Sequence, residues 1–545
     1  MPAETMLLFV LAAVAVIVAV RWFAGRTGLP AAAILPVIGI VYALLPGQNL
    51  TLDPDIVLTF VLPPLLYSAA LDASLLAIRR NLRIVVSLSV LLVFITALVI
   101  GYGFHFLVAG ATLAAGIAVG ATVAPPDPVA ALAVGRRVGL PPRLVTIIQG
   151  EGLLNDATAL TILSFAAAAV LGEGFSAPAA AGRFVVAAAG GAAVGAAVAY
   201  ALRLLRPLTR DPMSANAVSL ATPFGAYLLG EHLHVSGVLA VVVTGLVVGH
   251  HAPRTASGAS RLQTSAVWRL VDFLLEGFVF LLIGQQLPAV IRGLRQYGTS
   301  TVVTAVAVSV GSVLLIRPLW LLLTQSLPRS LHSRLGTGQH EGRLSGREVT
   351  VLSWAGTRGV ISLAAVFTLP RITPDRDLLL FCTFAVVLVT LVGQGLTFAP
   401  LVRLLGLRAD QVDEARLRNE ARAASVRAAL DRLDDLDRER REDPGHRDAD
   451  LDAADAEATD AMRDLLNQRL ARYQGRIDLL QSAESPEMPV SPQYEAGVRI
   501  RRVAMEAQRE ELLRWRDSGT LPDEGLRVLE RELDHEERLL PDRRK

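Results

Sequence analysis

The 545-residue chain has almost no lysine or cysteine. Its only lysine is Lys545, so it has no Gly-rich loop ending in the Gly-Lys-Ser/Thr that holds nucleotide phosphates. The same absence excludes a Schiff base to retinal or pyridoxal at an internal lysine. Its only cysteine is Cys382, which excludes an internal disulfide and a thiolate metal site. We therefore expect no ATP, no cofactor and no nucleic acid among its ligands.

Hydrophobic residues, by contrast, make up 52% of the chain, and the mean hydropathy is +0.46. Apolar segments recur at about the 17–25 residues that a helix needs to cross a bilayer. We count about thirteen such spans. They lie at 5–20, 29–45, 55–72, 84–107, 112–134, 143–171, 183–202, 214–230, 235–249, 268–291, 300–326, 348–370 and 376–402. After Arg408 the composition becomes rich in Arg, Asp and Glu. The sequence predicts an all-α polytopic membrane protein with a soluble helical tail.

The loops between these spans differ strongly in charge. One set of alternate loops carries eighteen arginines and the other set carries five. Because basic loops stay in the cytoplasm, the rich set and the tail are expected there. An odd number of spans then places the N-terminus outside. The loop charges thus predict a membrane protein whose tail is cytoplasmic.

The sixth span carries charged and amide side chains in an otherwise apolar helix: Glu151, Asn155 and Asp156. Counted from Arg143 at about 1.5 Å per residue, Glu151 lies roughly 12 Å and Asp156 roughly 20 Å along the helix. Both positions fall inside a hydrocarbon layer of about 30 Å. Ionisable groups at this depth are costly and typically mark an ion or proton path. The pattern is typical of a transporter that, without a nucleotide site, is driven by a gradient.

Two further spans are expected to be broken helices. Residues 122–128 contain Pro125, Pro126 and Pro128 with Asp127 between them, and residues 353–362 contain two glycines around Arg358. A Pro-Pro pair alone is more often a kink than a site. An unwound backbone inside a membrane, however, must be buried in protein or line a cavity. Two broken helices seven spans apart and opposite in direction predict the inverted repeats of a secondary transporter.

The intramembrane charges must also be balanced. Three carboxylates, Asp127, Glu151 and Asp156, lie at membrane depth together with Arg317 and Arg358. Buried charges of this kind either pair or titrate. A lone intramembrane glutamate could serve only as a packing ion pair, but the coincidence of five such groups favours an ion site.

Three motifs resemble the bacterial monovalent cation:proton antiporters of the Na+/H+ exchanger type. They are the runs Leu62-Pro63-Pro64-Leu65-Leu66-Tyr67-Ser68-Ala69-Ala70, Gly150-Glu151-Gly152-Leu153-Leu154-Asn155-Asp156-Ala157 and Trp354-Ala355-Gly356-Thr357-Arg358-Gly359. The segment from Phe273 to Gly284 supports them. The resemblance covers about residues 1–405.

The resemblance implies thirteen transmembrane helices over residues 1–405, a cytoplasmic tail over 406–545 and a homodimer. Scaffold helices would occupy about 5–72 and 214–291, and mobile core helices about 84–171 and 300–402. The implied activity is exchange of a monovalent cation, with Na+ expected, for protons across the plasma membrane, which would serve pH and sodium homeostasis. It is not an enzyme activity. The implied location is the inner membrane of a bacterial cell.

The resemblance also implies roles for particular residues. Asp156 would carry the cation and the proton in alternation, and Asp127 would lie across from it as a further cation ligand. Asn155, in place of a second acid, goes with electroneutral one-for-one exchange. Glu151 would form a structural ion pair, for which Arg317 is favoured over Arg358.

Three positions depart from the pattern of the family. The acid expected in the third span is Ser68, with Asp72 one turn further along, and the threonine expected before Asp127 is Pro126. The serine expected after Glu151 is Gly152. Pro126 still offers a backbone carbonyl, so Ser68 and Pro126 remain candidate cation ligands. Alkali cations need oxygen ligands, and the sequence leaves Na+, K+ and Li+ open.

The physical basis of exchange follows from desolvation. A carboxylate loses its hydration when buried, so Asp156 is expected to hold a proton unless a cation replaces it. Competition of one proton and one cation for the same oxygens suffices for antiport. A K+/H+ antiporter and a cation channel using the same acids remain the alternatives. An intramembrane protease is disfavoured, since there is no His-Glu-x-x-His motif and no Ser/His couple at one depth.

Overall fold

The computed structural model describes residues 3–27, 31–44, 56–171, 177–205, 211–326, 344–370, 372–407, 411–442, 449–482, 492–518, 520–521 and 523–537. Every regular element in these ranges is a helix, and no strand occurs in them. The chain divides into two compact units, Met1–Ala409 and Asp410–Lys545, and the expected boundary at residue 405 lies near this division. The predicted all-α architecture is confirmed.

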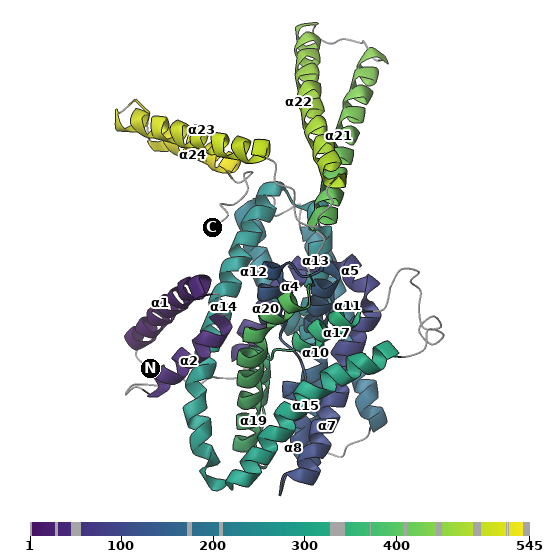
Figure 1. Cartoon of the computed structure of the whole chain (residues 1–545), viewed down its shortest axis with the longest axis vertical. Helices are drawn as coiled ribbons and strands as arrows, with labels where there is room; N and C mark the ends of the chain where they lie inside the picture. Colours follow the sequence, from purple (N-terminus) through teal and green to yellow (C-terminus); the bar gives the residue numbers. More distant parts are fainter. Residues whose placement is uncertain are drawn as a thin grey trace. The chain divides into compact units, whose positions relative to one another are not determined.

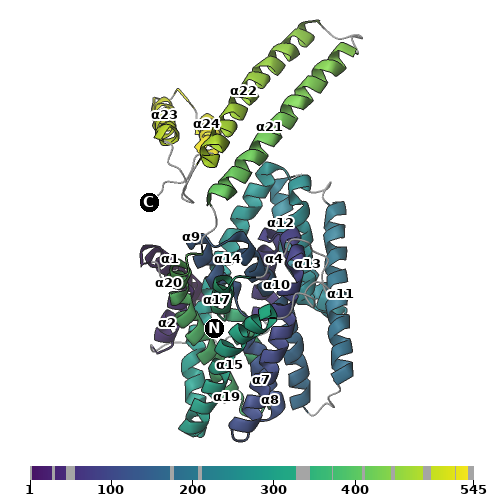
Figure 2. The same ribbon diagram turned by 45° about the vertical axis from the view of Figure 1, so that its right-hand side comes forward.

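The first unit is a bundle of long and short helices (Figure 1, Figure 2). Its first half comprises α1 (Ala3–Thr27), α2 (Ala31–Leu44), η1 (Val57–Val61), α4 (Leu62–Asp72), α5 (Leu75–Arg80), α6 (Leu82–Val86), η2 (Ser87–Leu91), α7 (Leu92–Leu107), α8 (Leu113–Val123), α9 (Pro128–Val138) and α10 (Pro142–Val170). Its second half comprises α11 (Ala177–Leu205), α12 (Pro212–His232), α13 (Gly237–Thr255), α14 (Gly258–Gly293), η4 (Leu294–Gln296), α15 (Thr299–Ser326), α17 (Gly346–Trp354), α18 (Val360–Phe367), α19 (Arg376–Leu388), η5 (Val389–Gln394) and α20 (Gly395–Leu404). Each of the thirteen expected spans coincides with one of these helices or with a short series of them.

Seven helical stretches in the described ranges are long and apolar enough to cross a membrane. They are Leu7–Thr27, Leu82–Leu107, Pro142–Val170, Ala180–Leu205, Gly237–Thr255, Thr299–Ser326 and Arg376–Leu404. Three shorter apolar helices accompany them: Ala31–Leu44, Val57–Asp72 and Leu113–Val123. The first unit thus has the apolar helices of a multi-pass membrane protein.

Two of the expected spans are each split into two helices. Helical geometry ends at Val123 and resumes at Pro128, where proline is tolerated because a first-turn residue needs no amide hydrogen bond. The second interruption separates α17 from α18 over residues 355–359. Both breaks predicted from the sequence are therefore confirmed.

The largest buried apolar cluster includes α8 and α18 of the broken helices, and a second one includes α9 and α17. The largest cluster draws on α7, α8, α10, α14, α15, α18 and α19, and Val93, Ala118, Leu363 and Val386 in it are completely buried. Small side chains dominate α8, which lets its neighbours approach closely. The short broken helices are consequently enclosed by protein, as an interrupted backbone at membrane depth requires.

Helices α2 and α14 cross in close contact through two glycines. A Cβ added at Gly284 would lie 2.1 Å from the carbonyl oxygen of Pro36, and one added at Gly39 would lie 2.2 Å from that of Leu281. Neither distance is sterically possible, so both positions require glycine for the backbones to approach. Such small-residue crossings are a main source of helix association in lipid.

The second unit consists of two pairs of charged helices. One pair is α21 (Gln411–Glu442) with α22 (Ala449–Gln481), which lie side by side in both views (Figure 1, Figure 2). Arg463 links them through ion pairs of 3.0 Å to Asp434 and 2.7 Å to Asp437. The other pair is α23 (Pro492–Asp517) with α24 (Asp523–Glu537), joined by Arg509 and Asp534 at 2.6 Å. These exposed pairs fit the expected helical tail, and each contributes at most about 1 kcal/mol.

The α2–α14 crossing gives a direct test of the packing. Gly284→Ala should lower the melting temperature and the monodisperse yield, because the new methyl group forces the two backbones apart at a cost of roughly 1–3 kcal/mol. Gly311→Ala in α15 is the matched control, since a Cβ there meets nothing within 4 Å. Size-exclusion chromatography of heated, detergent-solubilised protein measures both variants. Equal melting temperatures for the two would show that the crossing is not needed for stability.

Candidate functional site

The long helix α10 carries three polar side chains that all point into the protein. Glu151 is 1% exposed, Asn155 is completely buried and Asp156 is 5% exposed. Apart from Thr158, whose hydroxyl binds the carbonyl oxygen of Leu154, the other buried residues of α10 are apolar or glycine, and Gly152 packs against the ring of Pro128. The helix therefore brings its polar groups to the point where α8 gives way to α9.

The two broken helices meet at this point through their backbones. The amide of Asp127 donates to the carbonyl oxygen of Thr357 at 2.6 Å, and the hydroxyl of Thr357 donates to the carbonyl oxygen of Asp127 at 3.0 Å. The Asp127 carboxylate caps α9 by accepting from the amide of Val129 at 2.9 Å. A Cβ at Gly359 would collide with the same carboxylate, so glycine is required there. The two interruptions thus form one crossing with Asp127 at its centre.

Arg358 lies at this crossing and binds carbonyl groups. Its guanidinium donates to the carbonyl oxygens of Val123 at 2.8 Å and Ala124 at 3.1 Å, and also to that of Gly356. These oxygens belong to the C-terminal ends of α8 and α17, where helix carbonyls are unpaired and carry partial negative charge. Arg358 therefore compensates the ends of the broken helices and makes no described ion pair with a carboxylate.

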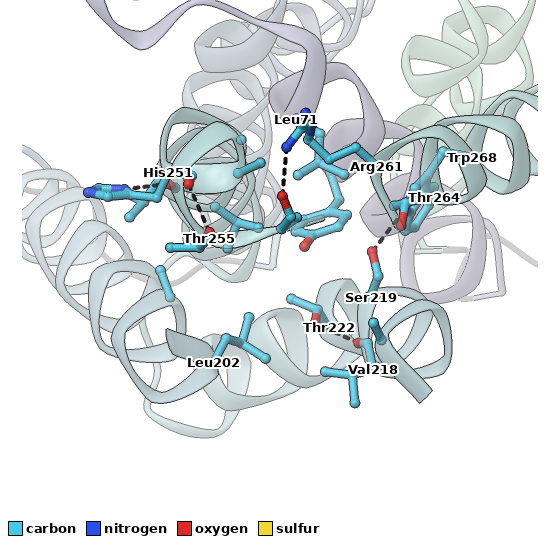
Figure 3. A pocket seen from close by; sticks show the side chains of 18 of the residues that line it. Leu71, Leu202, Val218, Ser219, Thr222, His251, Thr255, Arg261, Thr264 and Trp268 are labelled. Carbon is cyan, nitrogen blue, oxygen red and sulfur yellow. Dashed lines mark hydrogen bonds between the residues drawn. The ribbon is translucent and has the colours of Figure 1, made fainter. Parts of the chain in front are cut away.

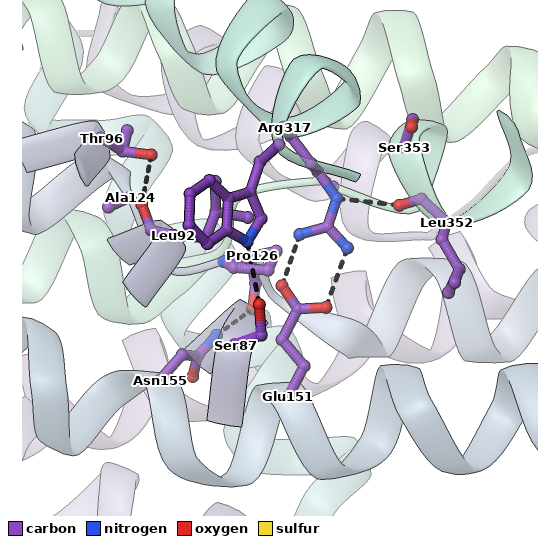
Figure 4. Close-up of polar contacts among 12 residues, drawn as sticks. Ser87, Leu92, Thr96, Ala124, Pro126, Glu151, Asn155, Arg317, Leu352 and Ser353 are labelled. Atoms are coloured by element: carbon purple, nitrogen blue, oxygen red, sulfur yellow. Dashed lines mark hydrogen bonds and ion pairs between the residues drawn. The ribbon is translucent and has the colours of Figure 1, made fainter. Parts of the chain in front are cut away.

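Glu151 instead faces Arg317 of α15 (Figure 4). The guanidinium of Arg317 binds both carboxylate oxygens of Glu151, with 2.8 Å between Nη2 and Oε2. Its Nε donates to the carbonyl oxygen of Leu352, at the end of α17, at 2.8 Å. Because Arg317 is only 2% exposed, this bidentate pair is shielded from water, and each of the three guanidinium nitrogens donates a hydrogen bond.

Asn155 and Asp156 differ sharply in their partners. The amide nitrogen of Asn155 donates to the carbonyl oxygen of Pro126 at 2.8 Å (Figure 4), whereas its side-chain oxygen has no hydrogen-bond partner. Asp156 has neither a hydrogen bond nor an ion pair with any residue in the described ranges. The sequence had kept the Pro126 carbonyl as a candidate cation ligand, and in the structure it is already bound by Asn155.

Asp156 lies on the wall of a cavity of about 300 Å³ at the crossing. The cavity extends between α4 and α14 on one side and the crossing with α10 on the other. Its polar lining comprises Ser68, Asp72, Asp127, Gln149, Asp156, Asp272, Glu276 and Ser362. Of the candidate ligands named from the sequence, the cavity brings together Asp156, Asp127, Pro126 and Ser68, while Asn155 lies behind the wall.

Two lining carboxylates were not among the candidates from the sequence. Asp272 and Glu276 lie one helical turn apart on α14, and Asp272 accepts a hydrogen bond of 2.6 Å from the hydroxyl of Ser68. The sequence did contain a signal, because residues four apart share one face of a helix and these two are the only acids of the span 268–291. They were missed because the segment from Phe273 to Gly284 was interpreted only as support for the resemblance, and neither Glu276 within it nor Asp272 just before it was considered as a ligand.

A second and larger cavity of about 540 Å³ adjoins the first (Figure 3). It is lined by the ends of α4, α11, α12, α13 and α14, and its labelled residues include Leu202, Thr222, His251, Arg261 and Trp268. The indole nitrogen of Trp268 donates to the hydroxyl of Ser219 at 3.0 Å. Ser68, Asp72 and Asp272 line both cavities and therefore stand where the two meet.

In the part of the chain that the structure describes, no group of three His, Cys, Asp or Glu side chains is arranged to hold a metal cofactor. What the site offers is a buried, unpartnered carboxylate beside a cavity, whereas the other charged residues that are buried in the described ranges, Glu151, Arg317 and Arg358, are held by fixed partners. Such an arrangement can bind a proton or a small cation and release it again.

Comparison with known proteins agrees with this geometry. The family model for the sodium/hydrogen exchanger, transmembrane region, matches residues 10–404. A Na+/H+ exchanger of Mycobacterium tuberculosis, described as uncharacterized, is 32% identical over 525 residues, covering 94% of this chain and 92% of its own. The Na+/H+ antiporter ApNhaP of Aphanothece halophytica is 31% identical over 407 residues, which is 74% of each chain.

Among solved structures, the sodium proton antiporter MjNhaP1 of Methanocaldococcus jannaschii has the same fold. Its structure at pH 8 superposes with a TM-score of 0.59 at 19% identity, covering 74% of this chain and 100% of that one. The resemblance inferred from the sequence motifs is confirmed: the chain belongs to the sodium/hydrogen exchanger family of membrane transporters.

Proposed function

We propose that the protein exchanges Na+ for protons, one for one, at Asp156. The observation that carries this proposal is the contrast between Asp156 and the other buried charges. Glu151, Arg317 and Arg358 are held by fixed partners, whereas Asp156 has none in the described ranges and lines a cavity. A carboxylate in this position needs a mobile positive charge, which a proton or an alkali cation supplies.

Antiport follows from competition for this one carboxylate. Its charged, empty form is too costly to expose to a low-dielectric barrier, so only the protonated or the cation-loaded form crosses. Because its neighbour Asn155 is neutral, one carboxylate balances one positive charge in either direction. We therefore propose that exchange is electroneutral and depends on the two ion gradients alone.

The moving parts are proposed from how the cavity is built. We name the helices of about residues 5–72 and 214–291 the scaffold, and those of about 84–171 and 300–402 the core. The scaffold supplies Ser68, Asp272 and Glu276 to one wall, and the core supplies Asp127 and Asp156 to the other. Sliding of the core along this wall would carry Asp156 from one membrane face to the other. We further propose a homodimer in the bacterial inner membrane, with the N-terminus outside and the tail in the cytoplasm.

K+/H+ exchange is the second candidate function, and the small number of oxygen ligands at the site supports it. Pro126 and Gly152 supply no side-chain oxygen, and the Pro126 carbonyl is bound by Asn155. A shell with fewer protein oxygens leaves more of the cation's hydration in place, which weakens selection by size. A series of cations offered to the reconstituted protein decides between the two.

Removing the carrier carboxylate tests the proposed mechanism. Asp156→Asn should abolish cation-dependent proton movement, because the amide neither releases a proton nor neutralises a cation. The measurement is the fluorescence of a pH-sensitive dye inside proteoliposomes after addition of Na+, K+ or Li+. Cation-dependent proton flux retained by Asp156→Asn would refute the mechanism, and uptake of Na+ without coupled proton flux in the native protein would favour a channel.

The Glu151–Arg317 pair is proposed to be structural. Glu151→Gln should lower folded yield and thermal stability, since it leaves the Arg317 guanidinium buried with less compensation, at a cost of about 3–5 kcal/mol. The double variant Glu151→Gln/Arg317→Met, which removes both charges, should recover part of this loss. Thermal unfolding of the purified variants measures the effect. If Arg317→Ala were as stable as the native protein, the pair would have no structural role.

A further inference from the structure

Ser68 stands where the resemblance places an acid, and the structure gives it a carboxylate partner from another helix. Its hydroxyl donates to Oδ1 of Asp272 at 2.6 Å, joining α4 to α14 within the scaffold. A second hydrogen bond of 3.1 Å from the same hydroxyl to the carbonyl oxygen of Leu65 orients Ser68. The position of Ser68, where the resemblance places an acid, is therefore joined to a carboxylate on α14.

Asp272 belongs to a row of acids that leads toward the carrier. Asp72 at the end of α4 and Glu276 on α14 both lie within electrostatic range of Asp272. Glu276 in turn lies within electrostatic range of Asp127, and Asp127 within that of Asp156. All five acids line the 300 Å³ cavity. The row thus runs from the C-terminal end of α4 to the point where the two broken helices meet.

The row is more than a group of acids, because it ends on a buried carboxylate without a partner. Asp156 is 95% buried and lines the same cavity, so a ligand that enters this cavity from the 540 Å³ cavity passes Asp272, which lines both. Asp272 itself is half-buried and forms no ion pair with a described residue, whereas Glu276 lies within electrostatic range of Arg21. Cavity walls of one charge sign concentrate ions of the opposite sign.

We propose that Asp272, oriented by Ser68, is a cation-contacting residue that receives the monovalent cation on the scaffold wall before it passes to Asp156. Ser68 occupies Oδ1, and no described residue hydrogen-bonds Oδ2. Because Asp272 also lines the 540 Å³ cavity, a cation can approach it from either space. Asp272 does not exchange the proton, so it sets cation affinity without setting the turnover rate. This inference rests on the proposed antiport at Asp156.

The test separates cation affinity from turnover in proteoliposomes. Asp272→Asn should raise the half-saturating Na+ concentration about threefold or more, because the local attraction of cations is lost, while the maximal rate stays within about twofold. Ser68→Ala should give a smaller rise, since the carboxylate remains but is less well oriented. Glu231→Gln, an acid near the far end of α12 outside both cavities, is the matched control and should change neither quantity.

The exchange of the two side chains is the decisive variant. Ser68→Asp/Asp272→Ser keeps one carboxylate and one hydroxyl at the same contact, so it should restore the native half-saturating concentration. If Asp272→Asn does not purify as a monodisperse protein, the half-saturating Na+ concentrations of this double variant and of Ser68→Ala still test the inference. An unchanged affinity in Asp272→Asn, or a double variant as impaired as Asp272→Asn, would overturn the inference.

Assaying Asp156→Asn in parallel distinguishes the two proposals. If that variant is inactive and Asp272→Asn is unaltered, the inference about Asp272 fails and the antiport at Asp156 stands. If Asp156→Asn still exchanges ions, the proposal of antiport at Asp156 fails, and the inference about Asp272, which rests on it, fails with it.

Discussion

A charge buried in a membrane protein must be compensated where it lies, and this constraint organises the first unit. Glu151 and Arg317 compensate each other through a bidentate contact that also fixes the end of α17 at Leu352. Arg358 compensates helix ends and not a carboxylate. With these charges satisfied, Asp156 is the buried charged residue in the described ranges that is left without a fixed partner. The proposed transport therefore depends on how completely its neighbours are paired.

The crossing of the broken helices depends on the same groups. Two interrupted backbones expose carbonyl and amide groups that water would otherwise satisfy, and lipid offers no replacement. Arg358 binds the carbonyls of residues 123, 124 and 356, Asn155 binds that of Pro126, and Asp127 caps α9. Polar side chains that resemble a ligand set in the sequence thus hold the backbone in place. Asn155 holds the backbone through its side-chain nitrogen, which binds the carbonyl oxygen of Pro126. Its side-chain oxygen has no hydrogen-bond partner and remains available as a ligand.

On the scaffold side of the cavity, an acid that is replaced on one helix is compensated by acids on a neighbouring helix. Ser68 replaces an acid, yet the cavity keeps its carboxylates because α14 presents Asp272 and Glu276 one turn apart. The α2–α14 crossing at Gly39 and Gly284 anchors this helix within the bundle. The same helix therefore contributes to packing and to the charge of the cavity.

The sequence alone determined the membrane class, the two breaks and the presence of the acids within an apolar helix. Apolar length, the Pro-rich run at 122–128 and the position of Glu151 and Asp156 are local properties, readable without knowing any neighbour. Which arginine meets Glu151, that Arg358 serves carbonyls, and that Ser68 is joined to Asp272 across 204 positions of sequence were decided only by tertiary structure. The reason is physical: spacing along a helix fixes the face on which a side chain lies, whereas packing of the helices decides what that face meets.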